Sequence, residues 1–311
     1  MSDYRVERAL EIGAELGEHP LWSEADASLY WLDIEKATLN RFDPDTGANR
    51  VWALPSRPGC FAFASGGVVL AAQDGIYAMD LPDGGLKRIA EPAHDKAELR
   101  FNDGHTDRQG RLWVGTVRTD MDLARSEANA FYRLDANGLT QVLDRVGIPN
   151  GTAFSPDGRI LYRAQTELRT IFAHDYDPAT GTPSNQHVFA VVPDAYGMPD
   201  GAAVDSEGGY WVALARPPGT GPQGGVARFA PDGRLDRYIE LPVPFVTMPA
   251  FGGPDLSTLY VTTARLEAFM PGAVPPGAGD LFRIETEFRG APEAPLQQAD
   301  AWMRNRADEA I

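Results

Sequence analysis

The chain has 311 residues, 43% of them hydrophobic, and a formal net charge of −16. Nucleic acids and anionic membrane surfaces bind through basic patches, so this acidity argues against both as partners, and ordinary solubility is its simplest explanation. A single cysteine, Cys60, excludes an intrachain disulfide, and the absence of a membrane-length apolar run or a signal-peptide core predicts a cytoplasmic protein in a reducing compartment.

Residues 4–12 precede a series of repeats and alternate weakly between apolar and polar side chains. Such alternation is typical of a strand with one buried face. In a ring of repeats, we expect this segment to form the outer strand of the last repeat and to lock the first and last repeats together.

One β unit then recurs along the chain, and its clearest copy covers residues 149–162. Residues 152–154 (Thr-Ala-Phe) are β-prone, residues 156–158 (Pro-Asp-Gly) carry turn chemistry, and residues 160–162 (Ile-Leu-Tyr) are β-prone again. Six copies begin 42 to 50 residues apart, near Glu18, Cys60, Asn102, Asn150, Asp200 and Thr247.

Six spaced copies predict an all-β fold, a six-bladed β-propeller with four antiparallel strands per blade, because radial repetition lets each unit bury both faces. Length alone would suggest two domains, but a propeller is one closed unit, so residues 1–311 are expected to form a single domain. The tail, from about residue 291 to 311, contains Pro, Gln and Ala and then charged residues, and is expected to be peripheral or partly mobile.

Three long insertions, residues 118–129, 217–225 and 265–279, fall between the second and third strands of blades three, five and six. If the first strand of each blade runs down from one face of the ring, the second returns to that face. These insertions are therefore expected to surround the same mouth at which the first strands begin.

The first strands begin with oxygen-bearing side chains in four blades: Glu18, Asn102, Asn150 and Asp200. First strands line the central channel, so these side chains should converge. Two carboxylates and two amides suit a hard or borderline divalent ion such as Ca²⁺, Mg²⁺ or Mn²⁺, and Zn²⁺ and Fe²⁺ are compatible as well. Without an ion the two carboxylates would repel, and at least one pKa would rise. We therefore expect one divalent metal ion in the channel.

A purely structural interpretation treats Asn150-Gly151 and Asp200-Gly201 as turn formers. It does not account for Glu18, which is followed by His19 and Pro20. Cys60 is expected to be a small buried hydrophobic residue, and His19 to pack at the rim. The tryptophans that recur at hairpin positions are expected to pack between blades.

Four segments carry a family resemblance: residues 16–22 (Leu-Gly-Glu-His-Pro-Leu-Trp), 100–104 (Arg-Phe-Asn-Asp-Gly), 149–151 (Pro-Asn-Gly) and 199–201 (Pro-Asp-Gly). In this order they resemble the signatures of the senescence-marker-protein, gluconolactonase and luciferin-regenerating-enzyme family, which includes regucalcin. The resemblance spans nearly the whole chain and implies a six-bladed propeller with one divalent metal.

By match of motif, the resemblance implies Glu18, Asn150 and Asp200 as metal ligands. It implies Arg100 and Asn102 as substrate contacts, with Asn102 also close to the metal. An acidic residue of the family falls at Asp120, within the insertion of blade three, and would bind a sugar hydroxyl. Asp103 belongs to the second motif without an assigned role.

One position departs from the family pattern. An acidic residue usually stands at the top of the second strand of blade four, where this chain has Gln165 in the run Ala164-Gln165-Thr166. Gln165 is expected near Asn150, so restoring the acid should raise divalent affinity by roughly 1 kcal/mol.

The resemblance implies hydrolysis of a sugar lactone, such as a glucono-, xylono- or arabinonolactone, to the aldonic acid. The metal would polarise the ester carbonyl and acidify water, and Asp200 would be both a ligand and the catalytic proton acceptor. The alternatives are a metal-dependent esterase or organophosphate hydrolase of the same fold, a regucalcin-like calcium-binding protein, and a scaffold propeller. The oxygen-bearing channel positions argue against the scaffold.

Overall fold

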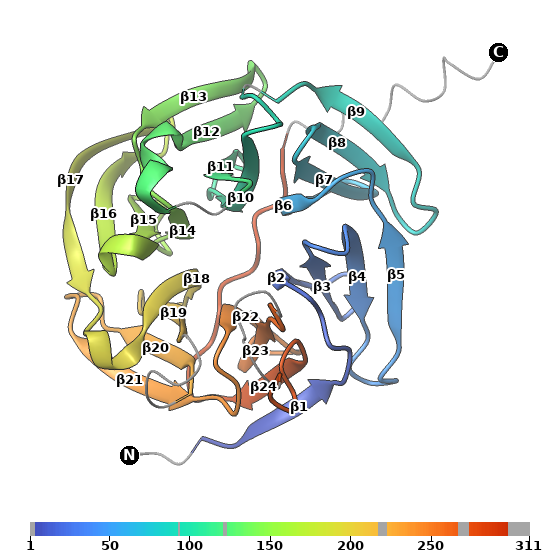
Figure 1. Ribbon diagram of the computed structural model, residues 1–311, viewed down its shortest axis with the longest axis vertical. Coiled ribbons are helices and arrows are strands. Elements are labelled where there is room, and N and C mark those ends of the chain that lie inside the picture. The colour runs from blue at the N-terminus through green and yellow to red at the C-terminus, as the bar shows by residue number, and fades with distance from the viewer. Residues whose placement is uncertain (1–3, 93, 121–122, 217–222, 267–273, 298–311) are drawn as a thin grey trace.

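The computed structural model describes residues 4–92, 94–120, 123–216, 223–266 and 274–297. Within these ranges the chain forms six antiparallel sheets of four strands, which stand as blades around a central axis (Figure 1). The predicted six-bladed β-propeller is confirmed.

Each blade is built outward from the axis, and its innermost strand comes first in five blades. Blades one to three comprise β2 (Gly17–Ser23), β3 (Ser28–Asp33), β4 (Thr38–Phe42) and β5 (Asn49–Ala53); β6 (Pro58–Ala64), β7 (Gly67–Ala72), β8 (Gly75–Asp80) and β9 (Leu86–Ala90); and β10 (Leu99–Thr106), β11 (Leu112–Arg118), β12 (Ala130–Asp135) and β13 (Gly138–Asp144). Blades four and five comprise β14 (Pro149–Phe154), β15 (Ile160–Gln165), β16 (Thr170–Asp177) and β17 (Thr182–Val191); and β18 (Met198–Val204), β19 (Tyr210–Ala215), β20 (Gly225–Phe229) and β21 (Leu235–Glu240). Short 3₁₀ turns cover Leu123–Ala128, Thr166–Leu168 and Asp194–Tyr196.

Blade six closes the ring with strands from both ends of the chain. It contains β22 (Val246–Gly252), β23 (Thr258–Thr263) and β24 (Leu281–Glu285), and the N-terminal strand β1 (Val6–Leu10) pairs with β24 as the outermost strand. An ion pair of 2.8 Å between Glu7 Oε2 and Arg283 Nη2 joins the two strands. The predicted closure by the segment before the first repeat is confirmed.

Large aromatic side chains fill the space between neighbouring blades. Trp22 of blade one stacks on Tyr260 of blade six, with ring centroids 5.7 Å apart. Trp113 of blade three donates its Nε1 hydrogen to the hydroxyl oxygen of Tyr176 of blade four over 3.0 Å. Such buried aromatic pairs contribute area and a specific geometry, so they hold adjacent blades at a fixed angle. The expected inter-blade packing is confirmed at both tryptophans.

The three insertions connect β11 to β12, β19 to β20 and β23 to β24, which are second and third strands of their blades. They therefore emerge on the face where the innermost strands begin, as predicted. Residues 121–122, 217–222 and 267–273 of these insertions lie outside the described residues. In the described part of the chain, no helix is long and apolar enough to cross a membrane.

After β24 the chain crosses the middle of the ring as an extended segment, residues 286–297, which we call the strap (red in Figure 1). The strap contacts the ends of innermost strands, so it lies at the opposite end of the channel from their beginnings. Its backbone bonds at Leu296 to Phe63 over 2.8 Å, and Leu296 is buried. Residues 291–297, expected at the periphery, thus occupy the centre of the fold, whereas 298–311 lie outside the described residues.

The strap places a charged pair inside the channel. Glu293 Oε2, in the strap, lies 3.0 Å from Nε2 of His105, which is near the end of β10. Both side chains are largely withdrawn from solvent, at 25% and 14% exposure. The strap and this pair therefore lie across the end of the channel opposite the face with the insertions.

Candidate active site

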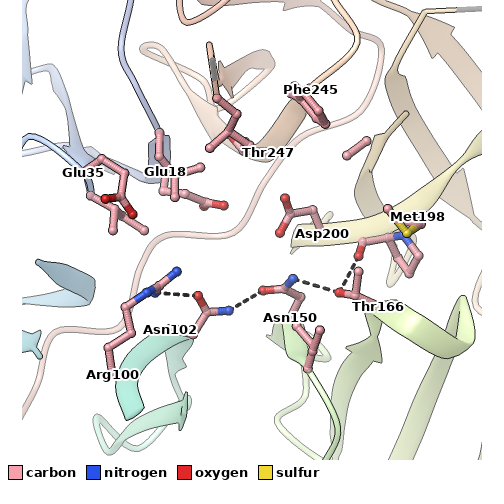
Figure 2. A pocket seen from close by; sticks show the side chains of 16 residues that line it. Glu18, Glu35, Arg100, Asn102, Asn150, Thr166, Met198, Asp200, Phe245 and Thr247 are labelled. Carbon is pink, nitrogen blue, oxygen red and sulfur yellow. Dashed lines mark hydrogen bonds between the residues drawn. The ribbon is translucent and has the colours of Figure 1, made fainter. Parts of the chain in front are cut away.

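A cavity of about 360 Å³ opens on that face at the mouth of the channel. Its polar side chains come from all blades except the second, and an apolar wall completes it (Figure 2). The polar group comprises Glu18, Glu35, Arg100, Asn102, Asn150, Thr166, Asp200 and Thr247; the apolar residues are Leu16, Ile34, Ile148, Met198, Pro199, Ala215, Phe245 and Leu266.

A recurring irregularity places the polar residues at the beginnings of four innermost strands. In each of β2, β10, β14 and β18 the pairing with the second strand gains one extra residue at or directly after the site residue. A bulge of this kind breaks the alternation of faces and re-aims a side chain. Glu18, Asn102, Asn150 and Asp200 consequently face one cavity, although they are separated by up to 182 positions in the sequence.

The residue after Glu18 carries backbone strain. His19 has a φ of +48°, and Gly151 takes the equivalent place after Asn150 with a φ of +58°. Glycine adopts such angles readily, whereas histidine needs its surroundings to hold it. The His19 Nε2 hydrogen is donated to the carbonyl oxygen of Phe61 over 2.8 Å, and burial lowers the His19 pKa to about 4. His19 is thus a neutral packing residue, buried below the rim, and its own main-chain N–H donates to Glu18 Oε2 over 3.0 Å.

A chain of hydrogen bonds crosses the floor of the cavity from blade three to blade five (Figure 2). Arg100 Nη1 donates to Asn102 Oδ1 over 2.9 Å, and Asn102 Nδ2 donates to Asn150 Oδ1 over 2.8 Å. Asn150 Nδ2 then donates to Thr166 Oγ1 over 2.9 Å, and Thr166 donates to the carbonyl oxygen of Pro199 over 2.9 Å. Both amide side chains are therefore oriented by their partners, with their Oδ1 atoms also carrying lone pairs available to a ligand.

The two candidate carboxylates are in an unfavourable electrostatic environment. Burial, followed by the charge of Asp200, raises the pKa of Glu18 well above its usual value. Burial, followed by the charge of Asp103, likewise raises the Asp200 pKa. Both side chains are open to the cavity yet enclosed by protein, so water solvates their charges poorly. A cation placed between them would reverse these shifts.

The donor set fits a divalent cation held by oxygen. Glu18 and Asp200 supply two negative charges, and Asn150, with Asn102 beside it, supplies neutral amide oxygens, as hard cations prefer. In the described part of the chain no group of three or more His, Cys, Asp or Glu side chains could hold a metal. A metal at this site would therefore depend on the amides as well as on the two acids.

Asp103, which follows Asn102 on β10, is buried close enough to this set for its charge to raise the pKa of both Glu18 and Asp200. Its Oδ2 accepts the main-chain N–H of Thr152 over 2.7 Å, and its buried Oδ1 has no hydrogen-bond partner among the described residues. Burial raises the pKa of Asp103 to about 6. Asp103 thus adds negative potential at Glu18 and Asp200, which further favours a cation between them.

Arg100 is the cationic group of the cavity. Its side chain is buried, and burial, followed by the nearby Arg57, lowers its pKa to about 10. Arg100 therefore remains charged near neutral pH. It also donates to the carbonyl oxygen of Phe101 over 2.9 Å, which fixes its guanidinium at the edge of the site.

Asp120 is placed differently from the other site residues inferred by resemblance. It accepts two hydrogen bonds from Arg118, of 2.9 and 2.7 Å, and its side chain is 48% exposed. It is not among the side chains that line the cavity. A role for Asp120 in binding substrate remains a prediction.

Gln165 pairs with Pro149 across the hairpin, one position from Asn150, and does not line the cavity. Its Nε2 donates to Glu167 Oε1 over 2.9 Å, and the Glu167 carboxylate accepts the main-chain N–H of Ile148 over 3.0 Å. The residue that faces Asn150 is instead Thr166, in the 3₁₀ turn that follows β15. Sequence reasoning expected Gln165 near Asn150, and the structure places it at this hairpin end, one position away; Thr166 was not anticipated.

Glu35 and the apolar wall were not anticipated. Glu35 lies in the turn between β3 and β4, the blade-one counterpart of the loops that carry the long insertions. The expectation that second-to-third-strand connections surround the mouth could have pointed to it. Ile34, Met198 and Phe245 are dispersed along the sequence and share no motif.

Comparison with known proteins agrees with this architecture. The family model described as SMP-30/Gluconolactonase/LRE-like region matches residues 16–265. The chain belongs to this family. The matched residues include Glu18, Arg100, Asn102, Asn150 and Asp200, so the polar residues of the cavity lie within the family region.

Two curated relatives are similar over most of their length. Pentonolactonase XacC of Haloferax volcanii is 36% identical over 297 residues, which cover 93% of this chain and 97% of the relative. The 6-deoxy-6-sulfogluconolactonase of Pseudomonas putida is 37% identical, with 80% and 84% covered. Among solved structures, the calcium-binding protein regucalcin from Agrobacterium tumefaciens superposes with a TM-score of 0.86 at 29% identity, covering 94% of this chain and 98% of that one.

Proposed function

We propose that this protein hydrolyses a sugar lactone to the aldonic acid with one divalent metal ion bound by Glu18, Asn150 and Asp200. The observation that carries this proposal is the convergence of two carboxylates with raised pKa values, two oriented amides and a buried arginine in a single cavity. The cavity volume, about 360 Å³, suits a monosaccharide lactone. The lactonase names of relatives at 36% and 37% identity support the same reaction class.

When bound, the ion would polarise the lactone carbonyl and make water easier to deprotonate. Asp200 is the candidate acceptor for a proton from the attacking water, because its carboxylate faces the cavity beside Glu18 and Asn150 and accepts a proton only in its ionised form. The water oxygen bonds to the carbonyl carbon, the ring ester C–O bond breaks, and the proton passes to the ring oxygen. The product is the open hydroxy acid, and no other reactant is needed.

Arg100 and Asn102 would orient the substrate during this reaction. The Arg100 guanidinium can donate to a hydroxyl or to the lactone carbonyl oxygen, and it favours the negative charge that develops on that oxygen. Asn102 accepts a hydrogen bond from Arg100 and donates one to Asn150, so it connects the proposed substrate-binding arginine to a proposed metal ligand. Asp120 is assigned by motif to a sugar hydroxyl.

Calcium binding without turnover is the second candidate function. The similarity to the calcium-binding regucalcin structure favours it, and the same oxygen set would serve Ca²⁺. This candidate differs from the first in requiring binding but no chemistry.

Metal titration combined with a lactone panel separates the two. The purified protein is dialysed against chelator, reloaded with Ca²⁺, Mn²⁺, Mg²⁺ or Zn²⁺, and assayed for acid release from five- and six-carbon aldonolactones and an aryl phosphotriester. Lactone turnover that disappears with chelator and returns with metal supports the lactonase. Metal binding without turnover of any lactone would favour the calcium-binding candidate, and preferential phosphotriester hydrolysis would favour an organophosphate hydrolase.

A further inference from the structure

Glu35 brings a third carboxylate to the cavity, apart from the proposed metal ligands. It lies in the turn after β3 and not at the beginning of an innermost strand. Figure 2 shows its carboxylate facing the cavity on the side of Glu18 and Arg100, with Met198 and Phe245 on the opposite side. Glu35 and Arg100 therefore form a polar edge of the cavity that faces Met198 and Phe245 across it.

Neighbouring blades hold Glu35 in this position. Arg57 Nη1, just before β6, lies 3.3 Å from Glu35 Oε1. Arg57 is fixed in turn, because its Nε donates to Gln73 Oε1 over 3.0 Å and Gln73 Nε2 donates to the carbonyl oxygen of Lys96 over 2.8 Å. The Glu35 charge is thus balanced by Arg57, unlike the charges of Glu18 and Asp200.

One oxygen of Glu35 remains available to a ligand. Oε1 accepts from Arg57, and among the described residues no hydrogen bond to Oε2 is present. The side chain is 36% exposed and lines the cavity, so a ligand in the cavity can reach it. An ionised carboxylate only accepts hydrogen bonds, and a sugar hydroxyl is the matching donor. Arg100 lies on the same side of the cavity and only donates hydrogen bonds. Glu35 can therefore accept the hydrogen of one lactone hydroxyl, while Arg100 donates to the oxygen of a neighbouring hydroxyl.

We propose that Glu35 is a specificity-determining residue that accepts a hydrogen bond from a hydroxyl of the lactone away from the reacting carbonyl. The inference rests on the proposed function. Its consequence is a preference for polyhydroxylated lactones bound with their hydroxyls toward Glu35 and Arg100. The C–H face or unsubstituted end of the same lactone packs against Met198, Ala215 and Phe245.

The test combines a variant with substrates that lack single hydroxyls. Glu35→Gln keeps the shape of the side chain and removes its charge, and the substrates are a parent aldonolactone and its mono-deoxy analogues. For the parent, kcat/KM is expected to fall about tenfold, the lower end for a hydrogen bond to a charged group, mainly through a higher KM. For the analogue that lacks the hydroxyl bound by Glu35, kcat/KM of the wild type is already reduced. The Glu35→Gln substitution should therefore lower kcat/KM for this analogue only slightly further.

Two further variants separate this role from others. Glu98→Gln removes one negative charge from the same face at a side chain that does not line the cavity, and it should leave the selectivity among the analogues as in the wild type. Asp120→Asn tests the acid assigned by motif. If Asp120→Asn abolishes discrimination among the analogues and Glu35→Gln does not, Asp120 binds the hydroxyl and the inference is wrong.

A Mn²⁺ titration of Glu35→Gln completes the experiment. Unchanged Mn²⁺ affinity together with altered selectivity supports the proposal. Weaker Mn²⁺ binding with an equal loss on the parent and all analogues would show that Glu35 acts on the metal site, and it would overturn the proposal. A wild type that turns over no lactone with any metal would reject the proposed function itself, which is a distinct result.

Discussion

Asn102 Nδ2 donates to Asn150 Oδ1 over 2.8 Å, which links the innermost strands of blades three and four at the floor of the cavity. This bond makes the substrate-side residue Asn102 a partner of the candidate ligand Asn150. Because the same Oδ1 can also face a cation, the orientation of the Asn150 amide depends on side chains from two neighbouring blades. The site is therefore a property of the closed ring.

Asp200→Ala is expected to lose metal binding and turnover while the propeller stays folded. Loss of a residue that hydrogen-bonds to a metal ligand lowers metal affinity by roughly 10- to 100-fold. Loss of the ligand Asp200 itself should lower the affinity at least as much. In chelator, the variant should melt no lower than the wild type at pH 8, because it lacks a buried carboxylate whose pKa burial raises. Calorimetric Mn²⁺ titration and thermal melts measure both effects. Full turnover of the variant after dialysis against chelator would contradict the metal proposal.

Thr166→Val should weaken metal binding without removing a ligand. The threonine hydroxyl accepts from Asn150 Nδ2 and donates to the Pro199 carbonyl, so valine of equal size leaves both partners unsatisfied. We expect a loss of about 1 to 3 kcal/mol in the free energy of unfolding, and a lower Mn²⁺ affinity. Thr170→Val, at a less buried position beyond the same turn, is the matched control. Equal Mn²⁺ affinities in both variants would show that Thr166 does not orient Asn150.

Gln165→Asp is expected to lower the stability of the fold with little gain in divalent affinity, whereas the family pattern suggests a clear gain in affinity. The new carboxylate would face the Glu167 carboxylate, which Gln165 now donates to over 2.9 Å, and a hydrogen bond would become a repulsion. The free energy of unfolding should fall by about 1 kcal/mol, with little gain in divalent affinity. Chemical denaturation and calorimetry test this, with Gln165→Glu as a longer-chain comparison. A clear rise in metal affinity would restore the interpretation from sequence.

The His105–Glu293 pair should make stability depend on pH. Burial is the largest single influence on the His105 pKa and lowers it, but the charge and the hydrogen bond of Glu293 together outweigh burial and raise the pKa. Burial likewise opposes the charge of Glu293, and the charge and hydrogen bond of His105 help to lower the Glu293 pKa. The His105 contribution is present below the unfolded pKa of about 6.5 and is lost as pH rises through the folded value. The Glu293 contribution is present above about 4.5 and is lost as pH falls.

The pair therefore contributes most between about pH 4.5 and 6.5. His105→Gln should lower Tm more at pH 5.5 than at pH 8.5, whereas the exposed His187→Gln should show no such difference. Equal losses for His105→Gln at the two pH values would indicate that packing of the strap, and not the ion pair, accounts for its effect.

Several features followed from the sequence because they depend on local pattern and ring closure. The sequence repeats turn residues between β-prone runs six times. This pattern predicts a propeller, in which each blade buries both faces against its neighbours. Once the ring closes, residues at the same place in each repeat must meet at the axis. The sequence alone therefore predicts that Glu18, Asn150 and Asp200 meet at one mouth of the channel.

Only the tertiary structure decided which way the side chains at the strand ends point. Bulges, an αL residue at His19 and short 3₁₀ turns set these directions, and none follows from alternation. Hence Thr166 and Glu35 face the cavity, whereas Gln165 bonds to Glu167 and Asp120 to Arg118. The strap has neither repeat nor periodicity, so its path depends on long-range contacts such as Leu296 with Phe63, which form only when all six blades are assembled.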